Sequence, residues 1–437
     1  MDESLTERDN MPIDRTHIRV TVLTVAGYFL DGFDLLVISV ALLTIVPAFH
    51  PSAVAEGLIG SATIAGMFFG GLGAGFLVDR LGRRRIYMWD LLVFIIFTVG
   101  AAFAQNIWQL IVFRGLLGVG IGADYALTLT IVSEFAPIKG RGTLMGAGLF
   151  AYWIGAVASI FLGLLFFVTT GGLAWRLTLL VGVIPAIIVL ILRHTVPESP
   201  RWKAVTEGKG LAGAKTSGSV KVLFERPFAR RVWLSYANWF INDIIFYGIG
   251  IYTPILLLGM GLKTHVASIS GSGVLDIVGM FGAFAGMLLL DRWGRRPLQA
   301  WGFLLQGLTL LAFALDPKPS LLILGIAFAI FYVANAGGTG QTTGIFVSEL
   351  VPTRVRGTAM GLGTAISRIG AFISVFLLPV ILKSDGIEVI LVLTGICALV
   401  GAVLTLGLPE TRNQSLESLN ENQMAQPGTL AASEMRS

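Results

Sequence analysis

Twelve apolar blocks, most of them long enough to cross a lipid bilayer, dominate this chain of 437 residues. Crossing the hydrocarbon core takes about 20 residues of helix, and a backbone in lipid must satisfy its polar groups internally, as helices or closed barrels do. The blocks do not alternate apolar and polar residues like barrel strands, and only 13% of the residues are charged. We therefore predict an all-α membrane protein with twelve spans. The blocks cover 18–46, 57–78, 86–104, 107–130, 143–168, 173–193, 229–259, 267–290, 297–316, 320–346, 357–382 and 387–408.

The basic residues between the blocks predict the orientation of the chain. About 25 of the 31 lysines and arginines fall at the N-terminus, in the even-numbered gaps or at the C-terminus. Positively charged loops stay in the cytoplasm, so we expect a multi-pass protein of the cell (plasma) membrane with both termini cytoplasmic. These loops account for the net charge of +5 without a nucleic-acid partner. Residues 1–17 are polar, and no cleavable signal is expected.

The second half of the sequence repeats the first. The motif Asp-Arg-Leu-Gly-Arg-Arg, which starts at Asp79, returns 212 residues later as Asp-Arg-Trp-Gly-Arg-Arg from Asp291. The segment 133–143 returns 215 residues later at 348–358. Two related six-helix halves follow from this repeat. The predicted organisation is a cytoplasmic segment 1–17, a first half 18–193, a cytoplasmic linker 194–228, a second half 229–408 and a cytoplasmic tail 409–437.

The repeated loops resemble those of the major facilitator superfamily, and the resemblance extends over about residues 20–415. Pro197-Glu198 and Pro409-Glu410 resemble the segments that end the two halves in the sugar-porter and phosphate-symporter branches of that family. The resemblance implies halves related by a pseudo-two-fold axis along the membrane normal, with the solute site between them. It also implies that charged contacts lock the cytoplasmic side when the site opens outward. A structural turn that only sets topology is the alternative. The candidate gating residues are Asp79, Arg83, Glu134, Arg141, Asp291, Arg295, Glu349 and Arg356.

Ionisable residues inside apolar blocks are costly to bury, so each is a functional candidate. Asp31 and Asp34 share a helix face because they lie three residues apart. Asp34 and Arg114 are predicted to lie at similar depths in the membrane. Burial raises the pKa of a carboxyl group and a nearby arginine lowers it, so an acid in this position can bind a proton in one conformation and release it in another. The segment around Asp34 also resembles the proton-site segment of sugar and phosphate symporters. We expect proton coupling through Asp31, Asp34, Arg114 and Asp124, with a static ion pair between Asp34 and Arg114 as the alternative.

Two further segments, 120–127 and 238–248, resemble the phosphate:proton symporters. The resemblance implies that Asp31, Asp124 and Asp243 lie on the proton and phosphate path. It also implies that Tyr125 and Trp239 contact the solute.

Four positions depart from the symporter pattern, and one of them is Ala123, which replaces a glycine. Trp153 stands where a glutamine is expected, Gln341 lies beside the glycine that replaces an asparagine, and Arg368 replaces a lysine. Arg368 either pairs with an acid such as Asp243 or binds an anion, because arginine suits bidentate recognition of carboxylate and phosphate. Aromatic residues in place of phosphate ligands favour a bulkier or aromatic organic anion. The expected solute-binding residues are Tyr125, Trp153, Trp239, Asp243, Gln341 and Arg368.

These features predict a secondary active transporter that works by alternating access, with proton-coupled symport of a small anionic solute, inorganic phosphate or an organic carboxylate. A proton-coupled sugar symporter is the alternative, although the paired glutamines of sugar porters appear here as Asn238 and Trp239. No histidine lies well inside a block and Cys397 is the only cysteine, so an enzyme, a metal site and a cofactor are not expected. The expected partners are the solute, protons and the bilayer, with a monomeric protein driven by a proton gradient.

Overall fold

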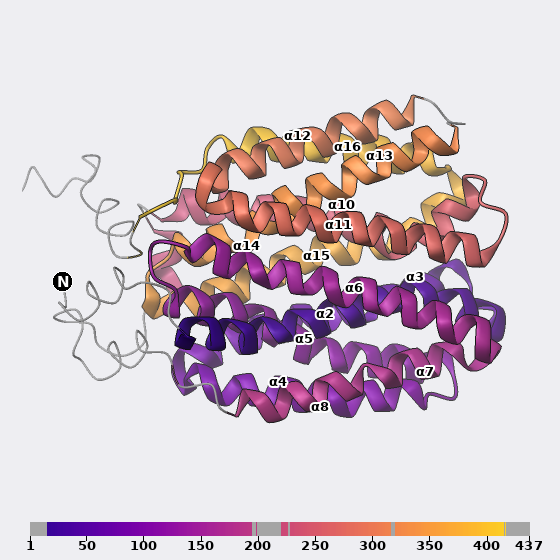
Figure 1. Cartoon of the computed structure of the whole chain (residues 1–437), viewed down its shortest axis with the longest axis horizontal. Helices are drawn as coiled ribbons and strands as arrows, with labels where there is room; N and C mark the ends of the chain where they lie inside the picture. The colour runs from indigo at the N-terminus through magenta and orange to yellow at the C-terminus, as the bar shows by residue number, and fades with distance from the viewer. Residues whose placement is uncertain are drawn as a thin grey trace, which may run out of the picture.

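The computed structural model describes residues 15–194, 198, 220–225, 228–315, 320–414 and 416, and most of these residues are helical. Each predicted apolar block is helical in the structure, which confirms the all-α prediction. By length and composition, 11 of the described helices are able to cross a membrane, and one of them, Arg141–Arg193, contains both the fifth and the sixth predicted blocks. The chain reverses inside it at Gly171, where φ is 57°, so its two arms are separate spans (Figure 1).

The halves lie side by side in Figure 1, the first in indigo and magenta and the second in orange and yellow. The first half contains α2 (Arg15–Phe49), α3 (Ala53–Leu81), α4 (Arg83–Ala102), α5 (Ile107–Phe135), α6 (Arg141–Thr170), η1 (Gly171–Leu173), α7 (Ala174–Val181) and α8 (Val183–Arg193). The second follows η2 (Val220–Phe224) and contains α10 (Ala229–Gly259), α11 (His265–Trp293), α12 (Arg295–Ala314), α13 (Leu321–Ala334), η3 (Asn335–Thr339), α14 (Gly340–Glu349), η4 (Thr353–Val355), α15 (Arg356–Ser384) and α16 (Ile387–Thr405). We call the end of the bundle where α2 begins and α16 ends the terminal end, and the opposite end the distal end.

The turns that carry the repeated motif depend on glycine. Gly82 joins α3 to α4 with a φ of 92°, and Gly294 joins α11 to α12 with a φ of 98°. Glycine adopts such angles without the steric penalty of a side chain. Each glycine therefore reverses the chain within one residue and leaves the acid of its motif near the end of the preceding helix.

Helices α3 and α15 form one of two long contacts between the halves. Near the terminal end, a Cβ atom added to Gly75 would lie 2.8 Å from the Cα atom of Gly361. Near the distal end, a Cβ atom added to Gly57 would lie 2.5 Å from the carbonyl oxygen of Phe376. Small residues permit this close backbone approach, which is typical of helix association in lipid. The two helices are therefore packed together along most of their length.

Helices α6 and α11 form the second long contact between the halves. A Cβ atom on Gly279 would lie 2.5 Å from the ring of Trp153, and one on Gly273, nearer the distal end, 3.1 Å from the Cγ2 atom of Ile160. At the terminal end, the backbone N–H of Gly142 donates to Asp291 over 3.0 Å. Both helix pairs are therefore in contact near both ends of the bundle.

Large apolar side chains cover the outside of the bundle. Ile191 on α8 is 67% exposed, Leu322 on α13 is 73% exposed and Val403 on α16 is 67% exposed. Such side chains would be unfavourable in water but are suited to contact with lipid tails. The buried polar residues accordingly face the interior between the helices.

Candidate functional site

A cavity of about 60 Å³ lies between the two halves. It is lined by residues of both halves, which agrees with a site at their interface. All six residues predicted to bind the solute line it, namely Tyr125, Trp153, Trp239, Asp243, Gln341 and Arg368. The sequence therefore identified residues that the fold brings together from α5, α6, α10, α14 and α15.

Arg368 is the cation of the cavity and is 1% exposed. Its Nη1 atom donates to Oδ2 of Asp243 over 2.5 Å, and Asn242 donates to the other carboxylate oxygen over 3.3 Å. The guanidinium carbon lies 4.5 Å from the ring centre of Tyr125 and 5.0 Å from that of Tyr247. Within the described part of the chain, Nε and Nη2 of Arg368 have no hydrogen-bond partner. Pairing with Asp243 thus leaves one edge of the guanidinium unused.

Aromatic side chains form much of the cavity wall. Trp153 lies 5.6 Å, between ring centres, from both Phe246 and Tyr332. On another part of the wall, the rings of Tyr28 and Tyr125 lie 4.7 Å apart. Trp153 fits because Gly279 of α11 has no side chain where the indole packs. The tryptophan is therefore part of the wall that joins the two halves.

The tenth predicted span is interrupted beside the cavity by the π-helical turn η3, which the sequence analysis did not foresee. Within it, Asn335 donates to Oδ1 of Asn242 over 3.0 Å. A Cβ atom on Gly338 would lie 2.8 Å from the Cα atom of Gly302 on α12, so the glycine-rich turn permits close helix packing. Single π turns inside helices are frequent at functional sites, and this one places amide groups of α10 and η3 at the cavity.

Gln341 follows η3 and also lines the cavity. Its Nε2 group donates to the carbonyl oxygen of Ala283 on α11 over 2.8 Å. This bond ties α14 to a helix that contacts the other half. One of the two N–H donors of Gln341 is therefore used within the protein.

Asp34 and Arg114, predicted as a proton-coupling pair, are both buried in the first half. They are close enough for an electrostatic interaction. In the part of the chain that the structure describes, however, Oδ2 of Asp34 and the three guanidinium nitrogens of Arg114 have no hydrogen-bond partner. The contact is thus looser than a hydrogen-bonded ion pair, unlike the static pair that we considered as the alternative.

Asp124, also predicted to couple protons, belongs to a different cluster whose cation is Arg193. Arg193 is 0% exposed and pairs with Asp124 over 2.6 Å and with Asp90 over 2.8 Å. Its guanidinium lies 3.7 Å from the ring centre of Tyr87. A Cβ atom on Gly27 would lie 2.0 Å from Oδ2 of Asp124, so α2 packs directly on this pair.

Sequence reasoning missed the role of Arg193. It is the last residue of the sixth apolar block, and we counted it among the basic residues that set topology. The presence of an acid near the start of the third block, Asp90, was the available signal. Asp31 is buried nearby and interacts electrostatically with Asp124 and Arg193.

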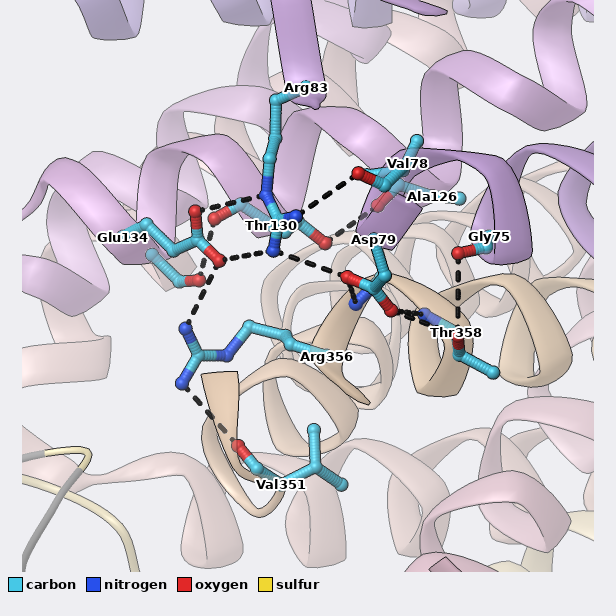
Figure 2. A network of polar contacts seen from close by, with 12 residues as sticks. Gly75, Val78, Asp79, Arg83, Ala126, Thr130, Glu134, Val351, Arg356 and Thr358 are labelled. Carbon is cyan, nitrogen blue, oxygen red and sulfur yellow. Dashed lines mark hydrogen bonds and ion pairs between the residues drawn. The ribbon is translucent and has the colours of Figure 1, made fainter. Parts of the chain in front are cut away.

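The first of two networks at the terminal end joins α3 to the start of α15 (Figure 2). Asp79 accepts hydrogen bonds from the backbone N–H of Thr358 over 2.7 Å, from its hydroxyl over 2.9 Å and from the N–H of Gly357 over 3.3 Å. The unpaired N–H groups at a helix N-terminus favour a carboxylate. Asp79 therefore bonds directly across the interface between the halves.

Two arginines extend this network (Figure 2). Arg83 pairs with Asp79 over 3.2 Å and with Glu134 over 2.9 Å, all within the first half. Arg356 of the second half lies 3.5 Å from Glu134. Glu134 thus contacts an arginine of its own half as well as an arginine from the other half.

The second network repeats the first with the halves exchanged. Asp291, at the end of α11, accepts from the N–H of Gly142 over 3.0 Å, from the N–H of Thr143 over 2.8 Å and from the Thr143 hydroxyl over 2.9 Å. Arg295 pairs with Asp291 over 3.3 Å and with Glu349 over 2.9 Å. The pseudo-symmetry seen in the sequence is therefore present in the contacts.

Three further residues complete the terminal end. Arg141 donates to the carbonyl oxygen of Gln414 over 3.2 Å. Glu198 accepts from the N–H of Arg83 over 3.0 Å, and Glu410 accepts from the N–H of Arg295 over 3.0 Å. The acid of each Pro-Glu motif thus caps the helix that follows the glycine turn, a role that the sequence analysis did not assign.

Comparison with known proteins agrees with this geometry. The family model described as Major Facilitator Superfamily matches residues 24–375 and 277–433. The putative metabolite transport protein YaaU of Escherichia coli is 30% identical over 427 residues, which cover 93% of this chain and 95% of that protein. The cis,cis-muconate transport protein of Acinetobacter baylyi is 31% identical over 356 residues, covering 79% and 82%. Inorganic phosphate transporter 1-11 of Oryza sativa is 26% identical over 488 residues, covering 92% and 87%.

A solved structure shares the fold. The proton:xylose symporter XylE bound to 6-bromo-6-deoxy-D-glucose matches with a TM-score of 0.80 at 20% identity, covering 93% of this chain and 99% of that one. The twelve-helix architecture predicted from the repeat is thereby confirmed. The protein belongs to the Major Facilitator Superfamily of membrane transporters, which are not enzymes.

Proposed function

We propose that this transporter moves a small anion, inorganic phosphate or an organic carboxylate, together with protons by alternating access. The observation that carries the proposal is Arg368, a buried cation in the cavity whose Nε and Nη2 groups are unpartnered among the described residues. Guanidinium groups bind carboxylate and phosphate in a bidentate way. An anion at this edge would satisfy donors that are otherwise costly to bury.

The relatives support an anionic solute. One is named as a transporter of inorganic phosphate and another as a transporter of cis,cis-muconate, a dicarboxylate. The alignment with each of these relatives covers more than two thirds of this chain. We infer that Arg368 supplies the charge that such solutes require in the cavity.

A surplus of buried acids supports proton coupling. Away from the terminal networks and from Glu56 in the first turn of α3, the described interior holds six buried carboxylates and three guanidiniums. The acids are Asp31, Asp34, Asp90, Asp124, Asp243 and Asp276, and the cations are Arg114, Arg193 and Arg368. An unpaired charge inside a membrane protein is costly, so neutrality favours a bound proton on the surplus acids. Asp31, Asp34 and Asp124, with Arg114, are the residues that we propose for coupling.

The networks at the terminal end supply a mechanism for alternating access. The carboxylates of Asp79 and Asp291 bind the N-termini of α15 and α6 across the interface. Opening the terminal end must break both sets of hydrogen bonds, so the networks act as gates that set the balance of conformations. We place the terminal end on the cytoplasmic side of the cell membrane, because the basic loops lie there. We also propose that the protein is a monomer that needs a proton gradient and no cofactor.

Uptake into proteoliposomes tests the proposed function. Purified protein is reconstituted with a lower external pH, and accumulation of cis,cis-muconate, phosphate and xylose is measured with and without a protonophore. We expect one of the two anions to accumulate, the protonophore to abolish accumulation, and Arg368→Gln to abolish it as well. The exposed Arg230→Gln is the matched control. Accumulation of xylose that survives Arg368→Gln would show instead that the alternative, proton-coupled sugar symport, is right.

A further inference from the structure

We propose that the cavity selects planar, conjugated carboxylates, aromatic or unsaturated, over phosphate and over saturated carboxylates of similar size. The inference rests on the proposed function, because it takes Arg368 as the anion site and asks which anion fits there. It combines the unused edge of the guanidinium with the chemistry of the surrounding wall.

The unused edge of Arg368 matches one planar acceptor. Nη1 is held by Asp243, which leaves Nε and Nη2 as parallel donors within the described residues. Two parallel N–H donors fit the two oxygens of a carboxylate in a common plane. The guanidinium also lies within 4.5 Å and 5.0 Å of two tyrosine ring centres. A group attached to the carboxylate would therefore extend beside aromatic rings.

The wall next to Arg368 favours a π system. It is formed largely by aromatic side chains, namely Tyr28, Tyr125, Tyr152, Trp153, Trp239, Phe246 and Tyr247. Aromatic rings contribute an attraction to other π systems beyond that of equal buried area. A saturated ring of the same size lacks this attraction and is also thicker than a flat one.

The amides of the cavity already donate to groups of the protein, which leaves only part of their donor capacity for a phosphate. Asn242 donates to Asp243 over 3.3 Å, Asn335 donates to Asn242 over 3.0 Å, and Gln341 donates to a backbone carbonyl over 2.8 Å. Phosphate presents more charge and more acceptor oxygens than a carboxylate, and a site that leaves them unsatisfied binds it weakly. Asp243 adds an acceptor of the same sign beside the ion. These contacts disfavour phosphate relative to a monocarboxylate.

Calorimetric titration of the purified full-length protein tests the selection. The probes are benzoate, cyclohexanecarboxylate, inorganic phosphate and xylose at neutral pH. Benzoate and cyclohexanecarboxylate share the carboxylate and a six-membered ring but differ in planarity and conjugation. We expect cyclohexanecarboxylate to bind about threefold to tenfold more weakly than benzoate, and phosphate more weakly still.

Two variants connect the selection to the residues. Replacing Arg368 alone leaves Asp243 buried without its cation, so the double variant Asp243→Asn, Arg368→Gln keeps the pair neutral; we expect benzoate affinity to fall about tenfold to hundredfold. Tyr125→Leu should reduce the difference between benzoate and cyclohexanecarboxylate. The control Arg230→Gln should bind all probes like the parent protein.

The outcomes separate this inference from the proposed function. Equal affinity for benzoate and cyclohexanecarboxylate, tighter binding of phosphate through Arg368, or no binding of either carboxylate overturns the selection of planar carboxylates. Phosphate binding that depends on Arg368 leaves anion transport standing. Binding of xylose alone, unchanged in the double variant, overturns both.

Discussion

The terminal networks and the membrane interior handle charge in opposite ways. The two networks contain four acids, Asp79, Glu134, Asp291 and Glu349, and three arginines, Arg83, Arg295 and Arg356, with Arg141 beside them at the terminal end. The two networks are nearly equivalent, because the pseudo-symmetry of the halves relates one to the other. Among the described residues, the interior away from these networks and from Glu56 holds twice as many buried acids as cations, and four of the six acids lie in the first half.

This difference assigns separate tasks to the two regions. Balanced and repeated contacts suit a gate, because each half must close on the other in the same way. Unbalanced charges suit proton exchange, because an acid without a cation holds a proton while it is buried and releases it when water or a cation comes near. The first half thus serves proton coupling in our proposal, and Arg368 of the second half serves the anion.

The largest expected effect comes from removing the cation of the Arg193 cluster. Arg193→Gln leaves Asp90 and Asp124 buried without a partner, and breaking such a pair costs about 3–5 kcal/mol. We expect a strongly lowered melting temperature in detergent. Combining Arg193→Gln with Asp124→Asn and Asp90→Asn should raise the melting temperature again toward that of the parent protein. An unchanged melting temperature for Arg193→Gln would contradict the account of this cluster.

Neutralising Asp34 should affect coupling more than folding. Its carboxylate has no hydrogen bond at Oδ2 among the described residues, so Asp34→Asn removes a proton carrier without breaking a tight pair. We expect at least about a hundredfold loss of uphill accumulation, equal to about 2.7 kcal/mol, while exchange across the membrane without a gradient continues. Uphill accumulation in Asp34→Asn with the pH dependence of the parent protein would refute proton coupling through this residue.

Breaking either terminal network should shift the balance between closed and open conformations by a similar amount. Asp79→Asn and Asp291→Asn each weaken hydrogen bonds to a charged acceptor, worth about 1.5–3 kcal/mol. We expect both variants to populate a state that is open at the terminal end. Spin-label distances between Arg85 and Arg292, both exposed, measure the shift. A large response to one variant and none to the other would show that the networks are not equivalent.

The smallest effect is expected at Asp276 on α11. It is buried, and its Oδ2 atom has no partner among the described residues. If this acid already carries a proton, Asp276→Asn is nearly isosteric and should change the free energy of unfolding by less than about 1 kcal/mol. Thermal unfolding of Asp276→Asn, measured alongside Arg193→Gln, provides the comparison. A loss as large as that of Arg193→Gln would show that Asp276 is charged and has a partner.

The sequence predicted the helices and many of the site residues because their signals are local. Block length sets the spans, and a fixed offset between repeated motifs relates Asp79 to Asp291. The six residues expected to contact the solute all line the cavity. Their positions came from the resemblance to known symporters.

The features that the sequence left out depend on tertiary geometry. Depth along a helix can be counted from its ends, but the neighbour at that depth cannot, so Asp124 was grouped with Arg114 rather than Arg193. The π turn η3 lies where Gly338 closely approaches α12, a contact between segments far apart in the sequence. The caps formed by Glu198 and Glu410 depend on where the chain returns after each half.

The most direct test of the central claim measures protons and solute in the same proteoliposomes. A pH-sensitive dye is trapped inside, cis,cis-muconate or phosphate is added outside, and uptake is followed by radiolabel, with protein-free liposomes as the baseline. The account predicts that uptake by the parent protein acidifies the interior in proportion to the anion imported, and that Asp34→Asn takes up no protons with the anion. Anion uptake by the parent protein without acidification would contradict it.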